Sequence, residues 1–342
     1  MNKVRQIYTL SRILLNYRKK KIRLSTLPIR LWIEPTNICN LQCIMCPNKE
    51  FSPQEKGVMD FNLFRKIIDE AKEFCQDVYL HHRGEPLIAP NFAEMIKYAR
   101  HSGLKVKFHT NASLLTEERA VQILDAAPDL ISFSFDGFSK DIYEKIRVGS
   151  NFEKTVENIS RFLQLKREKG KKKPYTIIEE IEFPQYKEFY NEKAKQAFSD
   201  KFRKLGLDEL IFKKLYNWAG SVDVEEEEVE KGYTMCTFIW YSAVILWDGT
   251  VTPCPQDFFG KIKLGNVSKD SLKNIWNDKP YQELRQLMAT SVKDFSPCNQ
   301  CDRLWRKKIG GLPIQYMISF LNDQIVGYGS IRKLLGSYER NE

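Results

Sequence analysis

The chain has 342 residues, of which 42% are apolar and 29% charged, and its formal net charge is +10. This composition is typical of a globular protein with a substantial core, and it excludes a disordered chain and a small disulfide-stapled domain. No apolar run approaches the roughly 20 residues of a membrane span, and no secretory signal pattern precedes the first predicted strand. We therefore expect a cytoplasmic protein whose eight cysteines bind metal or do redox chemistry.

The N-terminal region is strongly basic, with nine Lys or Arg and no acidic residue in positions 1–33. Apolar residues recur along it at a rough helical spacing: Val4, Ile7, Leu14 and Leu15. The pattern predicts a basic helical extension over 1–28. Two interpretations stay open, a capping helix with a solvated basic face and a helix that contacts a membrane surface or an anionic substrate. No nucleic-acid partner is expected, because no known binding module accompanies the charge.

Strand-like and helix-like segments alternate from residue 29 to 215. The predicted strands are 29–35, 78–86, 104–111, 130–137, 175–181 and 209–215. Three predicted helices begin after the candidate caps Asp60, Asn91 and Thr116. Two further helices are predicted over 152–168 and 188–205. Such alternation indicates parallel strands with right-handed crossovers. The six units predict an α/β fold, a partial (β/α)6 TIM-like barrel over 29–215 that stays open along one side because a closed barrel has eight.

The pattern changes after residue 215. The segment YSAVILWDGTVTPCP, 241–255, predicts two short strands around an Asp-Gly turn. We expect a small second domain over 216–310 and a helical tail over 311–342.

Three cysteines, Cys39, Cys43 and Cys46, lie within eight residues directly after the first predicted strand. Three thiolates can hold three irons of a 4Fe-4S cluster and leave the fourth iron open, whereas a structural metal site normally has four protein ligands. A zinc loop stays an alternative, with Cys75 or His81 as the nearest further ligands.

A CxxxCxxC loop in this position, on a chain of β/α units, resembles the radical SAM superfamily. The resemblance implies that the open iron binds S-adenosylmethionine (SAM). It also implies that one electron from the cluster cleaves SAM to a 5′-deoxyadenosyl radical, which abstracts hydrogen from a substrate.

Further segments are similar to the SAM-binding motifs of that superfamily. RGEP at 83–86 resembles GGEP with Arg83 in place of the first glycine, TNA resembles TNG with Ala112 for glycine, and SFSFDG resembles a fourth-strand motif. The resemblance assigns SAM contacts to Gly84, Glu85, Asn111, Ser134, Asp136 and Arg147.

The remaining cysteines form a second set, apart from Cys75, which lies on the apolar stripe of a predicted helix and is expected in the core. The members of the second set are Cys236, Cys254, Cys298 and Cys301. Their spacing resembles the SPASM/Twitch extension, which implies one auxiliary 4Fe-4S cluster with full protein ligation. Lys307 stands where the longer SPASM pattern has a further cysteine. A zinc ribbon is the alternative, because four thiolates also suit tetrahedral zinc.

The single auxiliary cluster favours a radical SAM oxidoreductase of small molecules, similar to the branch that oxidises a cyclitol alcohol to a ketone. A sugar, cyclitol or similar metabolite is then the expected substrate, and reduced flavodoxin or ferredoxin the expected electron donor. The alternative is a maturase that crosslinks or epimerises a ribosomally made peptide. Only 38 residues precede Cys39, which we take to be too few for a fused peptide-recognition domain. His81, His82 and His109 lie on predicted strands and could enter the site, but no substrate base is assigned.

Overall fold

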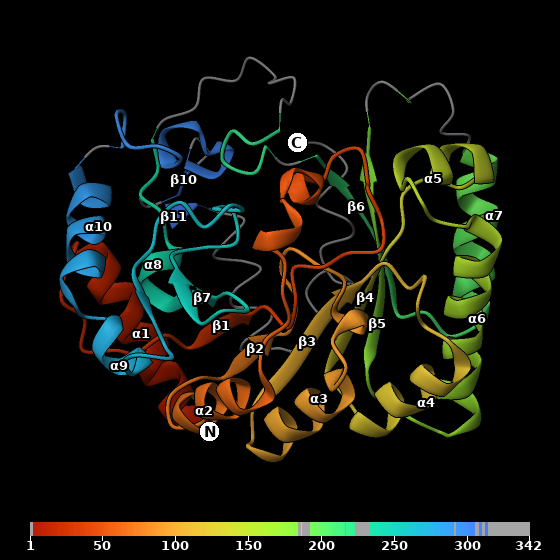
Figure 1. Ribbon diagram of the computed structural model, residues 1–342, viewed down its shortest axis with the longest axis horizontal. Helices are drawn as coiled ribbons and strands as arrows, with labels where there is room; N and C mark the ends of the chain where they lie inside the picture. The colour runs from red at the N-terminus through yellow and green to blue at the C-terminus, as the bar shows by residue number, and fades with distance from the viewer. Residues whose placement is uncertain are drawn as a thin grey trace.

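The computed structural model describes residues 3–183, 186, 192–215, 217–222, 233–290, 292–304, 308–309 and 312–313. Within these residues the main sheet has nine strands in the order β6-β5-β4-β3-β2-β1-β7-β8-β9 (Figure 1). Six neighbouring strands pair in parallel: β1 Arg30–Ile33, β2 Asp77–Tyr79, β3 Lys105–Thr110, β4 Leu130–Ser134, β5 Tyr175–Glu182 and β6 Glu209–Lys214. The predicted partial (β/α)6 barrel is confirmed.

Helices along one side of the curved sheet connect these strands (Figure 1). They are α2 Phe61–Ala71, α3 Phe92–His101, α4 Glu117–Ala126, α5 Lys140–Ile146, α6 Phe152–Glu168 and α7 Glu192–Lys204. Short 3-10 turns occupy Pro47–Glu50, Pro53–Glu55, Pro86–Ile88, Cys298–Gln300 and Asp302–Leu304.

Two of the three predicted helix caps form as expected. The Asp60 carboxylate accepts hydrogen bonds from two backbone N–H groups of α2, and the Thr116 hydroxyl accepts one from the backbone of α4. The prediction for Asn91 is wrong in one respect, because its side chain makes no capping hydrogen bond to α3. Its backbone (φ −107°, ψ 30°) departs from the extended conformation that aims a capping side chain at the first turn.

The two faces of the parallel strands differ in polarity. On the outer face, Val78, Val106 and Ile131 are fully buried in the apolar core that the helices complete. Alternation along the strands turns Asp77 and Lys107 to the inner face. There the buried Asp77 carboxylate lies 2.7 Å from a nitrogen of Arg30 and 2.9 Å from that of Lys107. Burial raises the pKa of Asp77, but the two cations outweigh it and hold the pKa well below its usual range.

The C-terminal region continues the same sheet. β7 (Ser242–Ile245) pairs in parallel with β1, and β8 (Thr250–Thr252) returns antiparallel across the predicted Asp-Gly turn. The further elements are α8 Phe238–Tyr241, β9 Gly265–Asn266, α9 Leu272–Ile275, α10 Lys279–Thr290, β10 Lys308–Ile309 and β11 Leu312–Pro313. The predicted hairpin is thus confirmed. The boundary between residues 215 and 216 stays a prediction, and one sheet contains strands from both sides of it.

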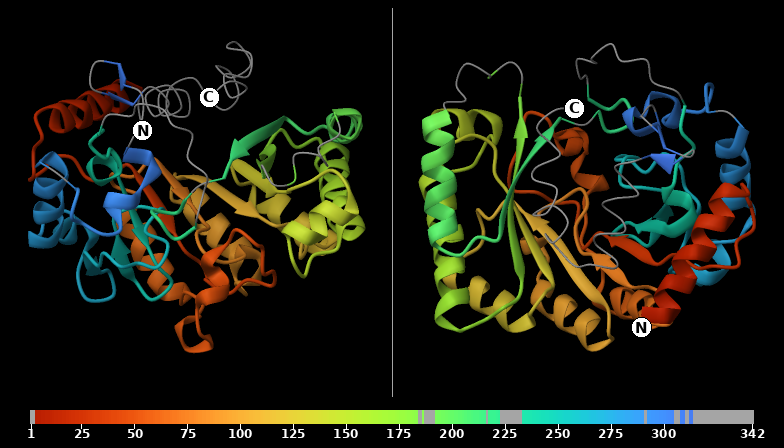
Figure 2. Two further views of the ribbon diagram at one scale, coloured as in Figure 1. Left: turned by 90° about the horizontal axis from the view of Figure 1, so that it is seen from above. Right: turned by 180° about the vertical axis from the view of Figure 1, so that it is seen from behind.

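The N-terminal helix α1 (Lys3–Arg18) lies against this C-terminal region (Figure 2). Tyr17 meets the Trp240 ring edge-on at 5.5 Å and donates a hydrogen bond to the carbonyl of Met235. No helix in the described part of the chain has the length and apolar character needed to cross a membrane. The predicted tail over 311–342 lies outside the described residues except for two residues of β11.

Candidate functional site

The first cysteine loop follows β1 and is fixed by backbone hydrogen bonds. The Cys46 N–H donates to the Cys43 carbonyl within the loop. The N–H groups of Gln42 and Ile44 donate to carbonyls on either side of Arg147, at 2.9 and 3.0 Å. The loop therefore has a defined position beside Arg147.

The three thiols of this loop lie close enough to influence one another. Burial raises the pKa of Cys39 to about 11 and that of Cys46 to about 12, and it also raises that of Cys43. Neighbouring thiols add to the pKa shifts of Cys39 and Cys46. The Asp136 and Glu85 carboxylates add to the pKa shift of Cys43, whereas the Arg147 guanidinium opposes all three shifts. Protons therefore stay on the sulfurs until a metal displaces them.

Gly84 brings the RGEP segment against the cysteine loop. A Cβ atom at this position would lie 2.5 Å from the carbonyl oxygens of Thr36 and Ile38, which is closer than any side chain tolerates. The next residue, Glu85, donates its N–H to the same Ile38 carbonyl at 2.9 Å. Only glycine permits this approach, so the sequence motif has a steric reason here.

The Glu85 carboxylate joins the loop after β2 to the end of β3. It accepts hydrogen bonds from the Thr110 hydroxyl at 2.7 Å and from the Asn111 N–H at 2.8 Å. The Asn111 side-chain amide donates to Asn40 at 3.1 Å and lies 4.0 Å from the Cys39 sulfur. Three of the predicted SAM contacts, Gly84, Glu85 and Asn111, thus lie against the cysteine loop.

Two further predicted contacts form a buried ion pair. Arg147 Nη2 lies 2.6 Å from Asp136 Oδ2, and both side chains are almost completely buried. Burial opposes the charge of Arg147, but Asp136 and Cys43 outweigh it and raise the pKa of the guanidinium. Its Nε is buried and has no hydrogen-bond partner among the described residues. The sixth predicted contact, Ser134, ends β4 and pairs in register with Glu179 of β5.

The donor set fits a 4Fe-4S cluster with one open iron. Three thiols gather in one loop, and a fixed cation with a free N–H donor lies beside them. Among the residues that the structure describes, no three His, Cys, Asp or Glu side chains converge as a single-ion site.

The second cysteine set is assembled from three separate segments. Burial raises the pKa of Cys254 well above its usual range, and Cys236, Cys298 and Cys301 raise it further. Three of these four thiols line one cavity, together with Thr237 and Gln256. The Thr237 hydroxyl and the Gln256 carbonyl oxygen are buried without a hydrogen-bond partner in the described part of the chain.

This second set fits an auxiliary cluster with four protein ligands. A thiolate cluster would take up the four thiols, and its sulfides would accept a hydrogen bond from the unpartnered Thr237 hydroxyl. Lys307, on which the prediction of a single auxiliary cluster depends, lies outside the described residues.

Sequence reasoning missed the role of Arg83. Its guanidinium makes two hydrogen bonds to the Glu34 carboxylate, at 2.6 and 2.7 Å, and both side chains are buried. It also contacts the carbonyl of Phe258 and lies over the Phe51 ring at 5.0 Å. The same carboxylate accepts the Trp247 N–H. This departure from the motif therefore links the barrel to the C-terminal region. Glu34 directly follows β1, but Arg83 lies in the loop beyond β2, so the sequence contains no clear signal that the two would pair.

A polar cluster lies on the inner face of the barrel strands, beyond the buried ion triad. The rings of His81 and His109 stack at 4.2 Å. His109 Nδ1 lies 3.7 Å from Glu179 Oε2, and Lys213 donates to that oxygen at 2.8 Å. All three histidines lie on predicted strands, but only His109 lies on an observed one, because β2 ends at Tyr79. The pairing with Glu179 and Lys213 could not be predicted, because strand register cannot be read from the sequence. We call His81, His109, Glu179 and Lys213 the inner polar cluster.

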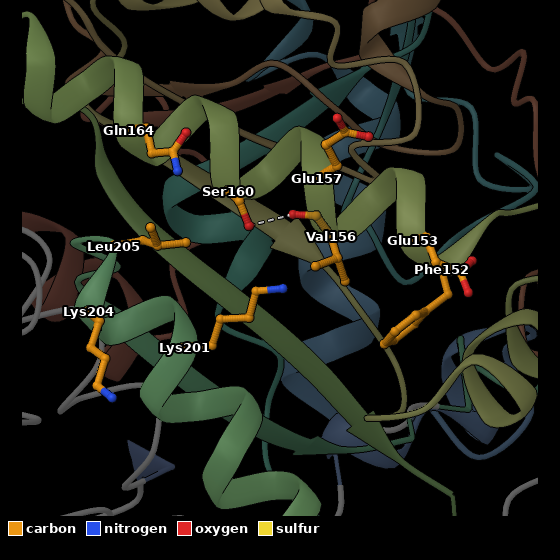
Figure 3. A pocket seen from close by; sticks show the side chains of 9 residues that line it. All are labelled: Phe152, Glu153, Val156, Glu157, Ser160, Gln164, Lys201, Lys204 and Leu205. Atoms are coloured by element: carbon orange, nitrogen blue, oxygen red, sulfur yellow. Dashed lines mark hydrogen bonds between the residues drawn. The ribbon is translucent and has the colours of Figure 1, made fainter.

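A separate open groove lies on the helical side of the sheet, between α6 and α7 (Figure 3). Val156 and Leu205 line it from the two helices, and Lys201 extends across it from α7. The Ser160 hydroxyl in its wall donates to the Val156 carbonyl at 2.7 Å, so this polar group already has a partner. The groove contains no cysteine and none of the predicted site residues.

Two family models match the chain. The model of the radical SAM superfamily matches residues 33–178, and the model of the SPASM iron-sulfur cluster-binding domain matches residues 236–302. The first match contains the cysteine trio and the RGEP segment, and the second contains all four cysteines of the second set. The description of the second family favours an iron-sulfur cluster over the zinc alternative.

Known proteins with similar sequences or folds align over most of the chain. A tungsten-containing aldehyde ferredoxin oxidoreductase cofactor-modifying protein of Pyrococcus furiosus is 27% identical, over 79% of this chain and 86% of its own length. The SAM-dependent 2-deoxy-scyllo-inosamine dehydrogenase of Niallia circulans is 23% identical, over 80% and 92%. The crystal structure of Streptococcus suis SuiB bound to precursor peptide SuiA matches the fold with a TM-score of 0.62 at 16% identity, over 89% and 76%.

Proposed function

Because this chain belongs to the radical SAM superfamily and carries a SPASM iron-sulfur domain, we propose that it oxidises a carbon of a small polar metabolite, of the sugar or cyclitol class. The chain is an enzyme whose cofactors are SAM, the SAM-binding 4Fe-4S cluster and an auxiliary iron-sulfur cluster. When bound, these groups supply a hydrogen-abstracting radical and an electron acceptor.

In this proposal each cysteine set has one task. Cys39, Cys43 and Cys46 hold the cluster with the open iron, and the second set holds the auxiliary cluster. The residues proposed to bind SAM are Gly84, Glu85, Asn111, Ser134, Asp136 and Arg147. The unpartnered Nε of Arg147 supports this role, because a buried guanidinium donor without a partner suits a carboxylate ligand.

The observation that carries the proposed substrate class is the inner polar cluster. Alternation along β3, β5 and β6 turns His109, Glu179 and Lys213 to the same face of the strands. His81 lies just after the end of β2 and stacks on His109. His81 Nδ1 is buried there without a hydrogen-bond partner among the described residues. An unpartnered polar atom is costly in an apolar environment, so a substrate with several hydroxyl groups fits this lining better than an apolar one.

Within the cluster, His109 is our candidate for the group that accepts the substrate's hydroxyl proton. Burial lowers the pKa of His109 despite the opposing effect of Glu179, so the imidazole is neutral near pH 7 and has a free lone pair. Glu179, which accepts a hydrogen bond from Lys213, lies 3.7 Å from Nδ1 of the same ring. In the proposed oxidation the substrate loses one hydrogen atom, this proton and one electron, which yields a carbonyl.

The relatives that align over most of the chain support a small-molecule substrate. One is named for a cyclitol derivative that it dehydrogenates, and the other for a cofactor that it modifies. The likeness to peptide-bound SuiB is one of fold, at 16% identity. Peptide maturation is therefore the alternative that the experiment must distinguish from the oxidation of a small molecule.

The test is an anaerobic assay with SAM, reduced flavodoxin or ferredoxin, and a panel of sugars and cyclitols deuterated at carbinol carbons. We expect deuterium in 5′-deoxyadenosine and one carbonyl formed per 5′-deoxyadenosine. His109→Gln should abolish the carbonyl while SAM cleavage continues, whereas His101→Gln, on the exposed end of α3, should change neither. Deuterium transfer from no member of the panel, together with a crosslink or epimer in a peptide encoded nearby, would overturn the proposal.

A further inference from the structure

The N-terminal helix α1 has two apolar faces, and one of them lies in solvent. The inner face buries Ile13 and Tyr17 against the C-terminal region. The outer face exposes Val4, Ile7 and Tyr8 by 72%, 58% and 61% of their surface. Exposed apolar side chains that gather in one contiguous patch are unusual unless the surface meets a partner.

The exposed residues form a continuous stripe. At 100° per residue, Val4, Tyr8 and Leu15 fall within about 40° of one another, with Ile7 and Leu14 along one edge. From the first to the last of them the stripe extends about 17 Å along the helix axis. We call these five residues the outer stripe.

The charged residues of α1 and of the turn that follows it, residues 3–23, are all positive. Arg5 and Arg12 follow one side of it, and Arg18, Lys19 and Lys21 gather at the end of the helix. No ion pair joins residues 5–23 to an acidic side chain within the part of the chain that the structure describes. An apolar stripe bordered by arginine and lysine is the pattern of helices that lie in the plane of a membrane surface.

We propose that α1 binds the surface of an anionic lipid bilayer. The outer stripe enters the boundary between headgroups and acyl chains, and the basic side chains bind lipid phosphates. A second copy of this helix fits poorly, because pairing two outer stripes would bring their basic borders together. A nucleic acid would pair with the basic side chains, but it would leave the apolar side chains of the outer stripe exposed to solvent.

Lipid contact would also position the auxiliary region. The Tyr17 hydroxyl on the inner face of α1 holds the carbonyl of Met235 at 2.7 Å, next to Cys236. The Trp240 indole donates to the Lys21 carbonyl at the end of the basic cluster. α1 is thus fixed to the C-terminal region, and a bilayer that holds α1 also holds this part of the enzyme near its surface.

The test is sedimentation of the full-length protein with phosphatidylcholine vesicles that contain either no or 30% phosphatidylglycerol. We expect binding to the anionic vesicles alone, weakened by added salt. Ile7→Asn/Leu15→Asn should reduce binding at least about 10-fold, through loss of apolar insertion. Lys19→Gln/Lys21→Gln should reduce it by roughly 5-fold for each lysine removed.

The control variant has the same change in charge at the other end of the molecule. Helix α6 lies at the opposite end of the long axis from α1 (Figures 1 and 2). Lys169 and Lys172 are exposed directly after α6. Lys169→Gln/Lys172→Gln should leave vesicle binding unchanged, and circular dichroism confirms that each variant is folded. Equal binding to neutral vesicles, equal loss in the control, or no binding would each overturn the proposal. None of these outcomes bears on the proposed reaction.

Discussion

The two cysteine sets show two ways of assembling a metal site. The trio lies in one loop within eight residues, and neighbouring backbone holds it. The second set extends from Cys236 to Cys301, so the fold of the whole C-terminal region must bring its members together. The geometry of the trio depends on a few contacts between its loop and the neighbouring backbone. The geometry of the second set depends on the packing of the whole C-terminal region. Variants at the two sets should therefore fail in different ways.

The largest expected effect separates the two tasks. Cys43→Ala should abolish SAM cleavage, because the cluster with the open iron loses a ligand. Cys254→Ala should keep SAM cleavage to 5′-deoxyadenosine and abolish the oxidised product. Iron analysis after anaerobic reconstitution should fall from about eight to about four per chain in each variant.

Cys75→Ala is the matched control for both. Cys75 is buried, and its thiol donates to backbone carbonyls away from either set. The variant should keep about eight irons per chain. If Cys254→Ala lost SAM cleavage as completely as Cys43→Ala, the division of labour between the sets would be wrong.

The next effect concerns the link between the two regions. Arg83→Gln leaves the Glu34 carboxylate buried without its cation, which should cost about 3–5 kcal/mol of unfolding free energy. Arg167→Gln, exposed on α6, should cost less than about 0.5 kcal/mol. Urea unfolding measures both.

A double variant shows whether the cost of Arg83→Gln comes from the uncompensated charge. Glu34→Gln/Arg83→Met removes both charges and should recover most of the lost stability. A double variant as unstable as Arg83→Gln would mean that shape, and not charge, determines the role of this pair.

The sequence predicted the parts of the structure that depend on short-range patterns. The six strands, the cysteine trio and the hairpin around Asp248-Gly249 are each indicated by a pattern that is only a few residues long. The pairing of β7 with β1 could not be predicted, because about 210 residues separate two four-residue runs that carry no register signal. The same limit hid the inner polar cluster, whose residues come from β3, β5, β6 and the segment just after β2.

Arg83 teaches a different lesson. In the motif it appeared as a substitution that weakened the resemblance. In the structure its charge pairs with Glu34, which directly follows the neighbouring strand β1. A departure from a motif can therefore mark a contact that the motif does not contain.

A smaller effect tests how closely the trio depends on local approach. Gly84→Ala places a Cβ against two backbone carbonyls and should cost about 1–3 kcal/mol. The substitution should also weaken the binding of the iron-sulfur cluster by the trio. A lower SAM-cleavage activity of the reconstituted protein would report this loss of iron. Gly103→Ala is the control, because nothing lies within 4 Å of its added carbon and only the left-handed backbone, φ 84°, is strained. Equal iron retention in the two variants would contradict a steric role for Gly84.

The last expected effect, a dependence of stability on pH, belongs to the trio's side of the molecule. Burial raises the pKa of Glu180 from 4.5 to about 9, and Asp136 adds to the shift, whereas the Gly137 N–H and Lys195 oppose it. The carboxyl therefore keeps its proton in the folded state at pH values where the unfolded chain releases it. Stability should be fully present below about pH 4.5 and fall as the pH rises toward 9, by up to about 1.4 kcal/mol per pH unit.

Glu180→Gln should remove this slope, because glutamine carries no titrating proton. The variant should therefore gain stability over the wild-type chain as the pH rises from 6 to 8, as urea unfolding at each pH would measure. Glu182→Gln, exposed two residues further along β5, should leave the slope intact. A wild-type stability that did not fall over this range would mean that Glu180 is ionised in the fold. Its charge would then lie behind the Asp136–Arg147 pair and weaken the proposed SAM site.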